Sequence, residues 1–366
     1  MKKVRMIGFA ALAALWLGLA IFAWCRPASD VSQWERRKLA QMPKLTANSL
    51  LSGSFMERFE EYTLDQFPLR DSFRQLKSLF HYKALGQLDN NGIYIADGQA
   101  AQLEYPLDEA SVQNALGKFQ ALYERYLAGT DSQIRFCIVP DKGYYLAEAN
   151  GYPALDYGRL AEMVEAGAPW AEPLDITGCL SAQDYYRTAT HWRQERLLGV
   201  AEAVCRAFGA AAPKDADFTE AAAGKPFLGV YHGQAALPMD AEELRYLTNS
   251  TLDACTVTHL DTGAVTPVYD FAKLESRDLY DIFLSGAQPI LTIENPNAQA
   301  GRELILFRDS FGSSLAPLLL SGYSRITLVD TRYISPALLG DHIDFHGQDV
   351  LFLYSTLVLN SSSALK

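Results

Sequence analysis

The sequence predicts an α/β protein with a doubly wound, mostly parallel sheet and an N-terminal transmembrane helix. Continuous apolar runs that suit strands buried on both faces occur at 134–141, at the start of 303–323, at 326–332 and at 349–356. Stretches with helical spacing of apolar residues alternate with these runs, as in a doubly wound sheet. A third observation is an N-terminal apolar run without charged residues.

This N-terminal run extends from Ile7 to Cys25, which is about the length needed to cross a hydrocarbon core of roughly 30 Å. Lys2, Lys3 and Arg5 precede it, so we expect the N-terminus inside and the main domain outside the cell membrane, with a single pass. A cleaved signal peptide is the competing interpretation. The segment WCRPASD after the run lacks a clean small-x-small cleavage site, which favours a retained anchor.

The remaining 341 residues divide into a polar stalk and one large domain. We expect an anchor at 1–25, a stalk at 26–50 and a domain at 51–366 with an irregular insert at about 213–295. Two helices are predicted in 52–86 with a break at Pro68, because proline interrupts helical hydrogen bonding. The stretch NNGIYIADGQ at 90–99 predicts a hairpin. Further helices are predicted at 109–128, 157–167 and 191–210.

Composition excludes several functional classes. The formal net charge of −11 argues against nucleic acid as a partner, because such binding depends on neutralising phosphates with basic residues. The histidines are dispersed and the five cysteines match no zinc spacing, so we expect no metal and no cofactor. Disulfides are permitted outside the membrane, although Cys137 in an apolar run is expected to be a free core thiol.

The segment LILFRDSFGSSLAP contains the clearest candidate for a reactive group. A buried strand leads directly into Asp309 and Ser310, and a helix then begins. This places Ser310 at the carboxyl edge of the sheet, where open α/β folds bind ligands, and near the free amides of a helix start, which can receive an oxyanion. The alternative is that Ser310 only caps the helix.

The segment YYRTATHW at 185–192 contains the second candidate, His191, at the edge of a predicted helix. A serine is a weak nucleophile until a base accepts its proton, and histidine is the usual base. A lone histidine is also compatible with packing in the core. Neither residue decides the function by itself.

Several motifs in order resemble the DHHW family and its relatives, the alginate O-acetylation proteins of AlgX/AlgJ type. They are SQWERRKLAQMPKLT, DQFPLRDSF, NNGIYIADG, VPDKGYY, YYRTATHW and LILFRDSFGSSLAP with the strand that follows. The resemblance covers nearly the whole exported part. It implies a three-layer α/β/α fold of SGNH-hydrolase type, a Ser310 nucleophile and a His191 general base. The implied reaction moves an acetyl group to or from a polysaccharide hydroxyl outside the membrane, with a membrane protein that supplies the acyl group as a further partner.

The chain departs from the family motif TDxHW at one position, where Ala189 replaces the aspartate. In a Ser–His–Asp triad this acid orients the imidazole and stabilises its protonated form, which alanine cannot do. Three outcomes remain open: a backbone carbonyl orients His191, another acid such as Asp184 does so, or the site is degenerate and only binds glycan. We doubt Asp309, because successive strand residues point to opposite faces. If the site is merely weakened, Ala189→Asp should raise turnover.

Five further residues, with Tyr185 in addition, are candidates for contact with the substrate. Tyr186 and Trp192, together with Tyr185, would form aromatic walls that suit sugar rings, and the alternative for them is core packing. Lys142 and Arg187 could contact an acidic sugar or an oxyanion, or serve as surface or structural residues. Arg308 could line the pocket, or only pack its stem. The leading hypothesis is therefore a membrane-anchored acyltransferase or esterase. A catalytically degenerate carbohydrate-binding or scaffold protein is the second, and a purely structural envelope protein the third.

Overall fold

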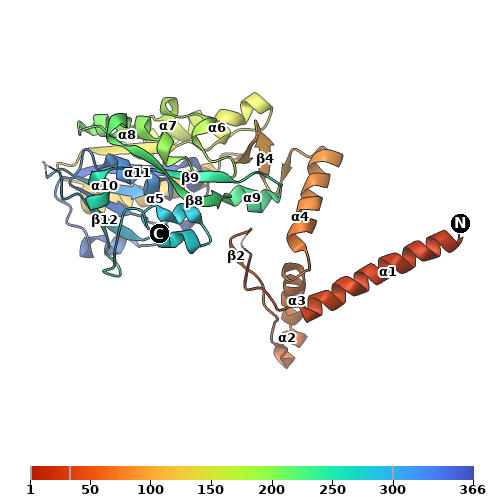
Figure 1. Ribbon diagram of the computed structural model, residues 1–366. Coiled ribbons are helices and arrows are strands. Elements are labelled where there is room, and N and C mark those ends of the chain that lie inside the picture. Colours follow the sequence, from red (N-terminus) through yellow and green to blue (C-terminus); the bar gives the residue numbers. More distant parts are fainter. Residues whose placement is uncertain (1, 33, 299–300) are drawn as a thin grey trace. The chain divides into compact units, whose positions relative to one another are not determined.

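The computed structural model describes residues 2–32, 34–298 and 301–366 (Figure 1). It contains two compact units, each of which is described by itself. The first comprises Met1–Asn91 and His232–Pro238, and the second comprises Gly92–Tyr231 and Met239–Lys366. The second unit contains all the candidate site residues.

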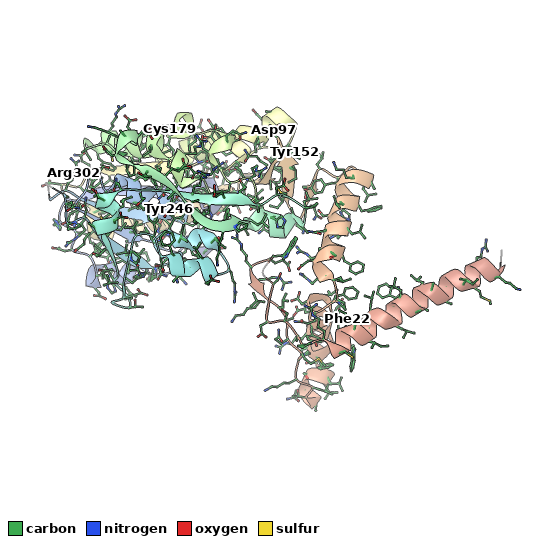
Figure 2. The ribbon with its side chains drawn as sticks, in the orientation of Figure 1. Phe22, Asp97, Tyr152, Cys179, Tyr246 and Arg302 are labelled. Atoms are coloured by element: carbon green, nitrogen blue, oxygen red, sulfur yellow. The ribbon has the colours of Figure 1, made fainter. Side chains whose placement is uncertain are left out.

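Helix α1, Lys2–Cys25, opens the first unit (Figure 1). Its stretch Arg5–Cys25 has a mean hydropathy of 2.3, and none of that stretch is buried. Phe22, which Figure 2 labels, is one of its exposed apolar side chains. The helix is long and apolar enough to span a membrane, as the sequence predicts, and these features fit a signal anchor or a single span.

The expected stalk contains short elements and is linked to the helices that follow it. It holds β1 (Val31–Ser32), β2 (Arg37–Lys38) and α2 (Ala47–Leu51), before α3 (Ser54–Asp65) and α4 (Arg70–Leu79). The predicted break lies between α3 and α4. Arg37 donates two hydrogen bonds to the Asp65 carboxylate, and Arg70 pairs with Glu35. These contacts join the segment that contains Arg37 to the segment that contains Asp65 and Arg70. The hydrogen bonds from Arg37 also lower the pKa of Asp65.

The second unit is built on an eight-stranded mixed sheet in the order β11-β10-β12-β14-β13-β15-β6-β7. Strands β14, β13, β15, β6 and β7 are parallel to one another, whereas β12 is antiparallel to β14 and to β10. The parallel part confirms the predicted α/β class with a mostly parallel sheet. The strands are β6 (Ile134–Val139), β7 (Glu172–Pro173), β10 (Thr256–His259), β11 (Val265–Thr266), β12 (Ile290–Glu294), β13 (Glu303–Arg308), β14 (Arg325–Val329) and β15 (Asp349–Ser355).

Apolar side chains on both faces of this sheet explain why its strands appear as continuous apolar runs. Phe307 and Phe352 belong to one core cluster, with buried residues of α5 (Glu109–Leu122) and α7 (Tyr157–Gly167). Leu306 and Leu353 belong to the other, with α8 (Leu198–Phe208) and α11 (Phe311–Leu319). A strand buried on both faces cannot show the polar alternation of a half-exposed strand.

The stretch 213–295 contributes to the main sheet through β10, β11 and β12, and it also forms a separate pair, β8 (Thr219–Phe227) with β9 (Glu242–Thr248).

Asn91 and Gly92 both have positive φ, as the predicted Asn–Gly turn requires, and β4 pairs with β5 directly after them. The remaining elements are β3 (Asp89–Asn90), β4 (Ile93–Ala96), β5 (Gln99–Gln102), α6 (Gly143–Leu146), α9 (Val230–Ala235), α10 (Ser250–Ala254) and α12 (Thr356–Asn360).

One predicted helix begins later than expected. The sequence predicts a helix over 191–210, but α8 begins at Leu198. Residues before it form a loop in which Tyr185 and Trp192 share an isolated antiparallel bridge. His191 therefore lies in this loop and not on a helix, because the buried Trp192 side chain and the bridge hold the backbone in another conformation.

Candidate active site

Ser310 lies in the tight turn between β13 and α11, at the carboxyl edge of the sheet. The neighbouring Asp309 fastens this turn, since its carboxylate accepts hydrogen bonds from the amide of Phe311 at 3.0 Å and from that of Ser355 at 2.8 Å. Ser355 ends the adjacent strand β15, so the turn is tied to the sheet. Both Asp309 oxygens thus hold backbone amides, and the Ser310 side chain stays partly exposed.

His191 reaches Ser310 from a segment 119 residues away. Its Nε2 lies 2.8 Å from the Ser310 Oγ, a hydrogen-bonding distance at which a neutral imidazole can accept the hydroxyl proton. Both residues are partly exposed, so an incoming molecule can reach the pair. Two segments that the sequence singles out separately therefore meet in one place.

Aromatic rings surround the imidazole of His191. The Tyr280 ring is stacked on it with a centroid distance of 4.0 Å and an interplanar angle of 4°, and the Phe311 ring lies tilted at 5.3 Å. The Tyr280 hydroxyl donates to the Ser314 Oγ, which also accepts a hydrogen bond from the Trp192 indole. Burial raises the pKa of Tyr280, which keeps its hydroxyl protonated and able to donate.

Most amides at the start of α11 already have acceptors, contrary to the expectation of several free donors. Phe311 donates to the Asp309 side chain, Gly312 to the Asp309 carbonyl and Ser313 to the Ser310 carbonyl. The amide of Ser310 itself has no hydrogen-bond acceptor in the described part of the chain. An oxyanion at this turn would therefore find one free backbone donor on Ser310, and not a row of helix-start amides.

The position of the missing acid is closed by packing. Ala189 is buried, and Gly229 approaches it so closely that a Cβ added to Gly229 would lie 2.2 Å from the Ala189 Cβ. Asp184, the other acid considered, accepts hydrogen bonds from the amide and the hydroxyl of Ser181 in its own turn. The structure therefore gives Asp184 a capping role in that turn.

Two charged side chains hold the loop that leads to His191. Lys142 Nζ donates to the carbonyls of Tyr186 at 3.0 Å and Arg187 at 3.3 Å. Glu242 accepts hydrogen bonds from the amide of Thr188 at 3.0 Å and from its hydroxyl at 3.2 Å. The buried side chain of Lys142 and the nearly buried side chain of Glu242 therefore bind backbone groups of three successive loop residues, which restrains the loop.

Lys142 makes stability depend on pH. Burial lowers its pKa to about 7, whereas in the unfolded chain an ordinary lysine titrates at about 10.4. Between these values the unfolded chain binds a proton that the folded chain does not, so the free energy of unfolding rises with pH by up to about 1.4 kcal/mol per unit. We expect the slope of the free energy of urea unfolding against pH, measured from pH 7 to 9 on the full chain in detergent, to be larger in wild type than in Lys142→Met.

The comparison is made between variants because buried thiols act in the opposite direction as the pH approaches 9, equally in both chains. Burial raises the pKa of Cys137, Cys205 and Cys255, so the folded chain keeps protons that the unfolded chain loses. The exposed Lys214→Met variant is the control and should retain the wild-type slope. Equal slopes in wild type and Lys142→Met would contradict the prediction.

The structure separates the five proposed substrate-contact residues. Tyr186, Trp192, Lys142 and Arg308 are buried, and Arg187 is exposed. The two aromatic rings have no exposed surface on which a sugar could stack, so core packing, the alternative considered for them, describes their placement. Tyr185 is buried as well.

Arg308 lies beneath the turn that holds Ser310. Its Nη1 is 3.6 Å from the Asp330 carboxylate and donates to the Asp309 carbonyl. The hypothetical Cβ of Gly312 would lie 2.7 Å from the Arg308 Cβ, so α11 begins directly over this side chain. Arg308 thus supports the turn from inside the fold. Arg187 is the candidate whose side chain remains at the surface, where its Nε lies 3.5 Å from Glu242.

Sequence reasoning missed Tyr280, Ser314 and Glu242. All three contact the site only through tertiary structure, and two of them come from the stretch 213–295 that lacks clear periodicity. No motif marks Tyr280 in the segment RDLYDIF. Its contact with the imidazole depends on tertiary packing, which the local sequence does not record.

Other features of the second unit lie apart from the Ser–His pair. A cavity of about 340 Å³ is lined by residues of β6 and α7 and by Thr356, and neither Ser310 nor His191 lines it. The four cysteines of this unit, Cys137, Cys179, Cys205 and Cys255, are free thiols, and so is Cys25 of the first unit. In the ranges that the structure describes, no group of three His, Cys, Asp or Glu side chains could hold a metal ion.

Comparison with known proteins supports the fold. No family model and no curated protein matches the chain. A DHHW family protein from Eubacterium siraeum superposes with a TM-score of 0.61 at 22% identity, covering 75% of this chain and 94% of that one. Bacillus cereus PatB1 superposes with a TM-score of 0.56 at 18% identity, covering 73% of this chain and 96% of that one. PatB1 has also been solved with a sulfonyl adduct, and that structure superposes with a TM-score of 0.55 at 18% identity over 73% and 95%.

At these identities the likeness concerns the fold. It confirms that the resemblance found in the sequence motifs extends to the three-dimensional arrangement over most of the chain. The α/β class implied by the resemblance is confirmed in the same way, with the antiparallel strands β10–β12 as an addition that the motifs do not reveal.

Proposed function

We propose that this chain is a serine-dependent O-acyltransferase or acetylesterase that acts on a polysaccharide of the cell envelope or an exported polysaccharide. The observation that carries the proposal is the 2.8 Å contact between Ser310 Oγ and His191 Nε2 at a partly exposed sheet edge. The motif resemblance and the shared fold support acetyl transfer as the reaction. The apolar α1 supports a location at the membrane, and Lys2, Lys3 and Arg5 before the apolar run support an outer location for the second unit.

In the first step, His191 Nε2 accepts the Ser310 hydroxyl proton as the oxygen attacks the carbonyl carbon of an acetyl ester. The carbonyl oxygen takes up negative charge, and the free Ser310 amide is the backbone donor that can stabilise it. Collapse of the tetrahedral intermediate breaks the ester bond. The departing alkoxide receives the proton from His191, and the acetyl group stays on Ser310.

In the second step, the hydroxyl of a sugar, or water, attacks the acetyl-serine while His191 accepts its proton. Collapse then releases the acetylated sugar, or acetate, and returns the proton to Ser310. Transfer and hydrolysis therefore differ only in the attacking molecule. Arg187, which is exposed and belongs to the loop that leads to His191, is the proposed contact for an acidic sugar. A membrane protein that supplies the acyl group completes the proposal.

A sulfonyl fluoride tests the proposal directly, because its reaction needs an activated serine. We expect the full chain in detergent to gain one phenylmethanesulfonyl group on Ser310, measured by intact mass and peptide mapping. Ser310→Ala should gain none. Ser313→Ala, which alters a buried serine on the same helix, is the matched control and should still be labelled.

The degenerate, glycan-binding alternative is favoured by one observation, Ala189 at the acid position. It predicts a folded chain that is not labelled at Ser310 and that does not turn over 4-nitrophenyl acetate. If the wild-type chain shows neither labelling nor turnover although it unfolds cooperatively in urea, the enzymatic proposal is rejected. Carbohydrate binding then remains.

A further inference from the structure

The Tyr280 ring is stacked on the face of the His191 ring. The two rings are nearly parallel, with an angle of 4° and a centroid distance of 4.0 Å. Tyr280 is 3% exposed and belongs to a short 3-10 turn, Leu279–Ile282. The Phe311 ring meets the same imidazole at 62°, so rotation of the imidazole out of its plane would collide with neighbouring rings.

Tyr280 is itself fixed by hydrogen bonds from its backbone amide and from its hydroxyl. Its backbone amide donates to the Asp278 side chain at 3.0 Å, and its hydroxyl donates to the Ser314 Oγ at 2.7 Å. Ser314 lies on α11, one helical turn after Ser310. The contacts therefore form a closed circuit from Ser310 to His191, through the stacked Tyr280 to Ser314, and back along α11 to Ser310.

We propose that Tyr280 is a positioning residue that fixes the plane of the His191 imidazole and stabilises its protonated form through the face of the ring. A triad acid normally orients the base and supports its positive charge. A stacked aromatic ring can do both, because stacking restricts rotation and the π face attracts a cation. This inference rests on the proposed function of the Ser310–His191 pair, and it assigns a role to a residue outside all the motifs.

The experiment separates the ring of Tyr280 from its hydroxyl. Tyr280→Phe keeps the stacking ring, and Tyr280→Leu fills the space with an apolar side chain that cannot stack. With the full chain in detergent and 4-nitrophenyl acetate as the substrate, we expect Tyr280→Leu to lower kcat about 10- to 100-fold with KM within about twofold. Tyr280→Phe should restore kcat to within about threefold of wild type.

Tyr323→Leu is the matched control, because it removes a buried tyrosine whose hydroxyl binds Asp349, away from the Ser–His pair. It should lose stability without the loss in kcat. If Tyr280→Leu does not fold, Tyr280→Met makes the same test with a more adaptable side chain. Wild-type kcat in a folded Leu or Met variant would overturn the inference, and so would an equal loss in Tyr280→Phe.

These outcomes differ from failure of the proposed function. If wild type shows neither turnover nor sulfonyl labelling at Ser310, the proposed function fails, and the positioning role fails with it. If wild type is labelled and active but the Tyr280 variants match it, only the positioning role is rejected.

Discussion

His191→Ala is expected to lower kcat/KM for 4-nitrophenyl acetate by about 10²–10⁴-fold, the usual range for loss of a general base. The serine then keeps its proton until hydroxide removes it, because alanine offers no acceptor within reach of Oγ. The remaining rate should therefore rise with pH as the hydroxide concentration increases. Steady-state rates of the full chain in detergent between pH 5 and 9 measure both effects.

His342→Ala is the control for this prediction. His342 is exposed and follows the 3-10 turn Pro336–Asp341, so its loss should leave the rate unchanged. If His191→Ala retains wild-type kcat/KM while Ser310→Ala does not, the serine has another base, and the 2.8 Å contact has no part in the chemistry.

Ala189→Asp is expected to destabilise the fold by about 3 kcal/mol or more, and not to raise turnover. The sequence alone suggests the opposite, since this substitution restores the family motif. In the structure the Ala189 methyl packs against the Gly229 backbone, and a Cβ on Gly229 would already lie 2.2 Å from it. A carboxylate at this position would be buried without a built partner, which is costly. Urea unfolding at pH 7 and turnover of 4-nitrophenyl acetate are the measurements.

Ala241→Asp, which adds the same charge at an exposed position, is the control and should change stability by less than about 0.5 kcal/mol. A stable Ala189→Asp variant with higher turnover would show that the loop can open to admit the acid. The account of Ala189 as a position closed by packing would then be wrong.

Much of the fold could be predicted because buried segments have apolar side chains at recognisable spacings along the sequence. The strands β6, β13, β14 and β15 are apolar on both faces and appear as unbroken runs, and the break between α3 and α4 follows from Pro68. The sequence does not reveal β10 and β12 as members of the main sheet. They are short, and their pairing is decided by partners far along the chain.

The helix predicted from residue 191 shows how tertiary contacts override local preference. The bridge between Tyr185 and Trp192, with the Trp192 indole bound to Ser314, holds the His191 loop away from helical geometry. The same packing buries Tyr186 and Trp192, which the sequence could equally place in a cleft. Aromatic composition alone does not distinguish a wall of a site from the core behind it.

The sequence by itself determined the apolar N-terminal helix, the α/β class and the two segments that carry Ser310 and His191, because each is written in neighbouring residues. Only the tertiary structure decided that these two side chains lie in contact, that Gly229 closes the acid position and that Tyr280 lies against the imidazole. Those facts depend on distances between segments more than 30 residues apart, and such distances follow from packing of the whole unit and from no local pattern.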